Sequence, residues 1–83
     1  MNEVFLSGKV ITEIEFKFII NSKRISKVKF SIETLTDSEI INILAYDEMA
    51  DYIFRNIKRK DTVVINGYLE NNNVVLKDIY LCN

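Results

Sequence analysis

The sequence predicts an all-β fold in which five strands form a barrel and one α-helix lies between the third and fourth strands. Two observations carry this prediction. Apolar and polar residues alternate with a period of two through most of the chain, which is typical of strands with one buried face. A helical stripe occurs only at Ala50, Ile53, Phe54 and Ile57, whose i, i+3, i+4, i+7 spacing places them on one side of a helix.

Two of the three strands before the helix lie in the first 35 residues. The first runs from Asn2 to Ile11, and Gly8 inside it suggests a bulge or a tight bend. The alternating segment Glu13–Phe18 reads as the bent continuation of this strand. A polar turn, Asn21–Arg24, then leads to a second strand over Ile25–Leu35.

The third strand, Ile40–Tyr46, follows a short turn at Thr36–Glu39 and is apolar on both faces except at Asn42, so we expect its outer face to be covered. Asp47 can cap the start of the helix with its carboxylate. Cations are favoured in the last helical turn, and the basic residues expected there are Arg55, Lys58, Arg59 and Lys60.

Two further strands complete the chain. Thr62–Glu70 alternates cleanly, and Val74–Leu81 follows a tight turn at Asn71–Asn73, where asparagine tolerates positive φ. Five short strands in a closed antiparallel arrangement, with a helix between the third and fourth, describe an OB-fold. The structural rival is a mixed sheet with the helix on one face. We expect one OB-fold domain over residues 1–83.

Composition narrows the range of functions. The chain has 83 residues and a formal net charge of -1, so it has no overall attraction for nucleic acid or membranes. It contains no histidine and one cysteine, Cys82, and so lacks the commonest general base and the usual metal ligands. We expect a noncatalytic protein without catalytic residues, metal or cofactor. We also expect a soluble cytoplasmic location, no membrane segment, and self-association that supplements a small core.

A local basic segment is more informative than the net charge. Five basic residues occur between Phe16 and Ile32 with no acidic residue among them, namely Lys17, Lys23, Arg24, Lys27 and Lys29. A hairpin would place three of these lysines on its solvent side and the other two residues at its tip, where they could neutralise phosphates. An ordinary solvated face, or lysines that protect an edge strand, would give the same pattern.

Exposed aromatic rings would distinguish a single-strand platform from a basic patch, because bases stack on them. Tyr46 and Tyr68 both fall on the parity opposite to the core residues of their strands. They could stack bases or lie in a subunit interface, where tyrosine is also enriched. Phe16 and Phe18 lie next to the basic hairpin, but their alternation favours burial, and Phe54 is expected in the core.

Several segments resemble bacterial single-stranded DNA-binding proteins. The opening MNEVFLSGKV is similar to the first strand of that family, where an apolar strand with a glycine precedes an acidic-aromatic-basic segment, here Glu15, Phe16, Lys17 and Phe18. KVKFSIET resembles the second strand. INILAYDEMADYIFRNIKRKDTVVINGYL resembles the third strand, the helix and the fourth strand, and VVLKDIYL resembles the closing strand. The resemblance covers nearly the whole chain in order.

The resemblance implies binding of single-stranded DNA, or of RNA, by a homodimer or homotetramer that serves DNA replication, repair or recombination. Tyr46 matches a stacking phenylalanine of the family, and Lys17 matches a basic position. Ile40 stands where the family has a stacking tryptophan, and the loops at Thr36–Glu39 and Asn71–Asn73 are short. In size the chain is similar to the related primosomal replication protein, which is dimeric.

The alternative is a protein-interaction or assembly module that keeps the fold but has lost nucleic-acid binding. The absence of tryptophan, the short loops and the acidic isoelectric point favour this alternative. Ile40, Leu44, Tyr46 and Tyr68 would then form an assembly surface.

Overall fold

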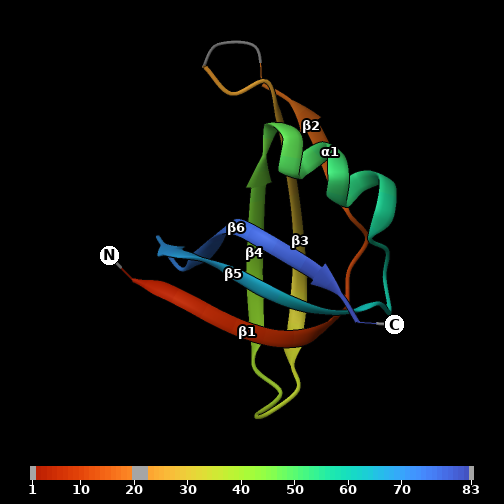
Figure 1. Cartoon of the computed structure of the whole chain (residues 1–83), viewed down its shortest axis with the longest axis vertical. Helices are drawn as coiled ribbons and strands as arrows, with labels where there is room; N and C mark the ends of the chain where they lie inside the picture. The colour runs from red at the N-terminus through yellow and green to blue at the C-terminus, as the bar shows by residue number, and fades with distance from the viewer. Residues whose placement is uncertain (1, 20–22, 83) are drawn as a thin grey trace.

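The computed structural model describes residues 2–19 and 23–82, whose strands close into a barrel (Figure 1). The elements are β1 (Glu3–Val10), β2 (Glu15–Phe18), β3 (Ser26–Thr34), β4 (Ile40–Tyr46), α1 (Asp47–Asn56), β5 (Thr62–Glu70) and β6 (Asn73–Leu81). The strands pair in the order β1-β5-β6-β4-β3-β2, and a further pairing between β1 and β3 closes the barrel. The predicted OB-fold is thereby confirmed, but the arrangement is not wholly antiparallel as expected, because β4 and β6 pair in parallel.

The expected first strand is divided into β1 and β2, so the helix follows the fourth strand of the structure rather than the third. Between them the chain still contacts β3. Ile11 N donates to Ser31 O at 3.0 Å, and Thr12 Oγ1 accepts from Ser31 N at 2.9 Å. Because the Thr12 hydroxyl accepts here in place of a backbone carbonyl, the ladder is interrupted at this point. The expected turn at Asn21–Arg24 lies in part outside the described residues.

Gly8 occupies the point where the barrel closes. It pairs with Thr34 of β3 on one side and with Val63 of β5 on the other. A Cβ atom at Gly8 would lie 2.7 Å from Glu33 O, so only glycine fits this close approach of two backbones. The register at Gly8 is regular, and the irregularity of the sheet lies instead between β5 and β6, next to Gly67.

The core fills the barrel and extends beneath α1. Its largest fully buried side chains are Phe30, Ile32, Ile43, Ile53, Ile65, Val10, Val28, Val63 and Val74. The predicted burial of this stripe is confirmed for Ala50, Ile53 and Ile57, which are at most 4% exposed, although Ile57 lies just past the end of α1. It is wrong for Phe54, which is 56% exposed and packs on Phe16 with ring centroids 4.9 Å apart.

Asp47 begins α1 in a way that the sequence did not indicate. Its carboxylate caps no helical N–H; Asp47 Oδ1 accepts from Ile25 N at 2.7 Å and from Ser26 N at 3.4 Å. Ser26 Oγ donates to Asp47 O at 3.3 Å, and the φ of Asp47 is 54°. The predicted helix cap is therefore wrong, and the side chain instead ties the start of α1 to the start of β3.

The far end of α1 also differs from the expectation. The helix ends at Asn56, and Ile57 is extended at φ -110° and ψ 138°. Of the four basic residues expected in the last helical turn, only Arg55 lies there. Lys58, Arg59 and Lys60 follow the helix rather than complete it. The predicted turn between β5 and β6 is confirmed, because Asn71 and Asn72 have φ values of 49° and 65°. Two consecutive positive φ values are typical of a type I′ hairpin.

Candidate nucleic-acid interface

Outward-facing residues of β2, β3 and β4 bring two of the predicted lysines and Tyr46 into one row. Lys17 lies directly opposite Lys27 in the β2–β3 ladder, and Lys27 lies directly opposite Tyr46 in the β3–β4 ladder. The next residues along β3 and β4, Val28 and Ala45, are fully buried. Because side chains alternate along a strand, the row Lys17–Lys27–Tyr46 lies on the outside of the barrel.

A second row begins beside the first. Glu15 lies opposite Lys29, and Lys29 lies opposite Leu44. Together with Lys17 and Lys27, Glu15 and Lys29 line a hollow of about 130 Å³. Sequence reasoning missed Glu15 as a member of this group, although it shares its strand parity with Lys17.

None of the three lysines in this hollow forms an ion pair with a carboxylate of the described residues. Lysines directly opposite each other repel, so the Lys17–Lys27 pair weakens the ladder that holds β2. The hollow therefore presents ammonium groups that an anion could neutralise.

Tyr68 lies farther along the same outer surface. Leu44 of β4 pairs with Val75 of β6, and Val75 pairs with Tyr68 of β5. Three strand spacings therefore separate Tyr68 from Lys29, roughly 14 Å at about 4.8 Å each. The structure does not bring Tyr68 to the lysines, although apolar side chains connect the two regions.

Arg24 lies over the ring of Tyr46, with its Cζ atom 4.1 Å from the ring centroid. This is a cation–π contact, and it covers one face of the aromatic ring. The hydrogen bonds from Ile25 N and Ser26 N to the Asp47 carboxylate hold the two segments next to each other. The link at Asp47 therefore also positions Arg24 against Tyr46.

Lys23 is placed apart from the other basic residues. It lines a hollow between the start of β3 and the start of α1, whose other lining residues are Phe18, Ile25, Ser26, Asp47, Glu48 and Asp51. The three carboxylates around it make this hollow less favourable for phosphate than the row of lysines.

The aromatic side chains of β2 are more exposed than their alternation indicated. Phe18 is 72% exposed, so its predicted burial is wrong, while Phe16 is half-buried. The two rings meet edge to face with centroids 5.2 Å apart. The strand has only four residues and is paired on one side only, so its end has no packed layer to cover it.

Residues 2–19 and 23–82 contain no group of three or more His, Cys, Asp or Glu side chains that could hold a metal ion. No helix in the same ranges is long and apolar enough to cross a membrane. The pKa of Asp37 is lowered, chiefly by the hydroxyl of Thr34, which donates to its carboxylate at 2.6 Å. Thr34 ends β3, and Asp37 lies in the turn that follows it.

Solved structures that superpose on this chain include single-stranded DNA-binding proteins. The SSB domain of a Synechococcus protein superposes with a TM-score of 0.86 at 13% identity, over 96% of this chain and 94% of that one. The mitochondrial single-stranded DNA-binding protein of S. cerevisiae superposes with a TM-score of 0.85 at 18% identity, over 99% of this chain and 94% of that one. The single-stranded DNA-binding protein of Thermus aquaticus gives 0.88 at 15% identity, and the chain spans 41% of its length.

Sequence comparison adds nothing to this likeness, because no protein-family model and no curated protein matches the chain. The likeness at 13–18% identity is one of fold. It agrees with the resemblance seen in the strand and helix segments of the sequence. The chain thus has the OB-fold of the single-stranded DNA-binding domains.

Proposed function

We propose that this protein binds single-stranded nucleic acid, DNA in the first instance, and catalyses no reaction on it. The observation that carries the proposal is the placement of Lys17 directly opposite Lys27, in register with Tyr46. Two opposed ammonium groups cost stability in the free protein, and a bound phosphate would offset that cost. The likeness in fold to proteins that are named for binding single-stranded DNA supports the same function.

The basic residues and the tyrosines of the proposed interface have different roles. Lys17, Lys27 and Lys29 contact phosphates, and Lys23 contributes at the periphery. Tyr46 stacks a base, either on the ring face that Arg24 leaves uncovered or by displacing the guanidinium, which then contacts phosphate. Tyr68 would contact a longer strand that continues over Leu44 and Val75.

Salt dependence tests the phosphate contacts. Each contact with a single strand contributes about 0.7 to the slope of log affinity against log salt, so five basic residues give a slope of about -3.5. The affinity for labelled oligothymidine, measured by fluorescence anisotropy, should then fall roughly 100-fold between 50 and 200 mM salt. An absence of binding at low salt would refute the proposal, and an oligouridine competitor would report the preference between DNA and RNA.

Two variants separate charge from stacking. Lys27→Glu with Lys29→Glu should weaken binding and reduce the salt slope by about 1.4, because two contacts are lost. Arg55→Glu with Arg59→Glu makes the same change in net charge on exposed residues outside the rows and should leave the slope unchanged. Tyr46→Ala should lower the affinity about fivefold or more at every salt concentration without changing the slope.

We also propose an oligomeric state and a cellular role for the protein. The small core and the exposed Phe5 and Ile40, at 70% and 65%, support self-association into a homodimer or homotetramer. A cytoplasmic protein of DNA replication, repair or recombination would fit a single-strand binder of this kind. A single domain over residues 1–83 would suffice for it.

A second function, as an assembly module without nucleic-acid binding, is favoured by one observation. The ring of Tyr46 is already covered on one face by Arg24, whereas Ile40, on the same outward face at the far end of β4, is exposed. In that case Tyr46→Ala would shift the monomer–oligomer equilibrium, measured by sedimentation, and oligothymidine would not bind.

A further inference from the structure

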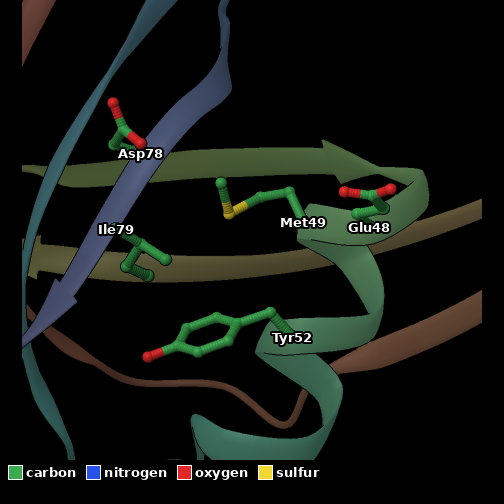
Figure 2. A pocket seen from close by; sticks show the side chains of 5 residues that line it. All are labelled: Glu48, Met49, Tyr52, Asp78 and Ile79. Carbon is green, nitrogen blue, oxygen red and sulfur yellow. The ribbon is translucent and has the colours of Figure 1, made fainter.

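A hollow between α1 and β6 is lined by Glu48, Met49, Tyr52, Asp78 and Ile79 (Figure 2). Figure 2 shows Met49 and Tyr52 extending from α1 toward β6, where Ile79 and Asp78 lie. The hollow has a volume of about 240 Å³. Pockets for drug-sized ligands have roughly 300–1,000 Å³, so this hollow suits one or two side chains rather than a cofactor.

The floor of this groove is apolar and adaptable. Ile79 is 7% exposed and belongs to the core, and Met49 packs against the core from α1. Tyr52 is 43% exposed, which leaves its ring available beside them. Methionine adapts its shape to different partners, and tyrosine is enriched where proteins meet.

The edge of the groove carries unneutralised negative charge. Glu48 stands at one end and Asp78 at the other, with Met49 between them in the view of Figure 2. No ion pair joins either carboxylate to a described residue. Lys77, the neighbour of Asp78 in the sequence, forms its ion pair with Glu3 at 3.8 Å.

We propose that this groove binds a short peptide segment of a partner protein, in which an arginine or lysine lies beside an aliphatic side chain. The aliphatic side chain contacts Met49, Tyr52 and Ile79, and the cation lies between Glu48 and Asp78. Charge complementarity selects this occupant, because the two carboxylates repel nucleic acid and acidic peptides. The groove shares no lining residue with the hollow of lysines, so the two sites are separate.

A designed peptide tests the proposal without knowledge of the natural partner. The probe is acetyl-Gly-Leu-Arg-Leu-Gly-amide, titrated into the ¹⁵N-labelled protein and followed by amide chemical shifts. Saturable shifts are expected at Met49, Tyr52, Asp78 and Ile79, and none at Lys27. A peptide with glutamate in place of arginine, and one with serine in place of both leucines, should bind at least about fivefold more weakly.

Two double variants locate the charge contribution. Glu48→Gln with Asp78→Asn preserves side-chain shape and should weaken the arginine peptide about fivefold, as expected for two partly solvated ion pairs. Glu39→Gln with Glu70→Gln removes the same charge at exposed positions outside the groove and should leave the affinity unchanged. Shifts outside the groove, equal binding of the glutamate peptide, no saturable binding, or unchanged affinity after the first double substitution would each overturn the proposal.

Discussion

Substitution of Asp47 by alanine should destabilise the protein by about 2.5 kcal/mol. Asp47 Oδ1 accepts from Ile25 N at 2.7 Å, and a hydrogen bond to a charged group contributes about 1.5–3 kcal/mol. We take the lower end of this range, about 1.5 kcal/mol, because the Asp47 side chain is only half-buried and solvent weakens the interaction. Alanine at a φ of 54° adds about 1 kcal/mol of left-handed strain. A domain of 83 residues has about 4–12 kcal/mol in total, so the loss is large.

Urea unfolding followed by circular dichroism measures this loss. At a slope near 1 kcal/mol per molar, the midpoint should fall by about 2.5 M. Two controls separate the contributions. Asp47→Gly removes the acceptor without the strain and should cost about 1.5 kcal/mol, while Asp47→Asn keeps an acceptor and tolerates positive φ, so it should cost about 1 kcal/mol or less. The reasoning fails if asparagine costs as much as alanine, or if alanine leaves the midpoint within error of the parent protein.

Three further changes probe the fold. Gly8→Ala sets a Cβ atom 2.7 Å from Glu33 O, and the forced separation of two backbones should cost about 1–3 kcal/mol in urea unfolding; an unchanged midpoint would contradict the close approach. Ile53→Ala, at a fully buried position, should cost about 2–5 kcal/mol in the same assay, and a loss below 1 kcal/mol would show that the site collapses around the change. Thr34→Val should raise the pKa of Asp37, followed by the ¹³C shift of its carboxyl carbon, because the main cause of the lowered value is removed. Since the folded pKa lies below the unfolded one, the contribution of Asp37 to stability is complete above the unfolded pKa and is lost as the pH falls through the folded pKa. This acid-dependent loss should be smaller in Thr34→Val.

The sequence predicted β4 and β5 residue for residue, because a polar turn precedes β4, while β5 alternates cleanly and ends at a turn of asparagines. It misplaced Phe18 and Phe54 for a common reason. Periodicity tells which residues share a face, but not whether another element reaches that part of the face. It also misjudged Asp47, since a tertiary partner 22 residues away in the sequence takes the carboxylate that a local cap would have used.

The sequence indicated which residues belong to the candidate site, but not which of them lie opposite each other. The lysines and Tyr46 were found from local charge and parity. The opposition of Lys17 to Lys27, and of Glu15 to Lys29, depends on strand register. Register is set by contacts across the whole barrel, and a slip of one residue would change every pair. For the same reason, the cover of Arg24 over Tyr46 could not be read from the sequence.

If an anion binds between Lys17 and Lys27, as proposed, the docking of β2 would depend on that ligand, because the two ammonium groups repel each other without it. The strand has four residues and pairs only with β3, so its attachment is the weakest in the sheet that carries the basic hollow. An anion that bridges the two ammonium groups binds the docked form better than the undocked form, and by linkage it stabilises docking. Oligonucleotide, or phosphate at high concentration, should therefore slow amide hydrogen exchange at Phe16 and Phe18 more than in β5. The short strand would act as a reporter of occupancy as well as part of the binding surface.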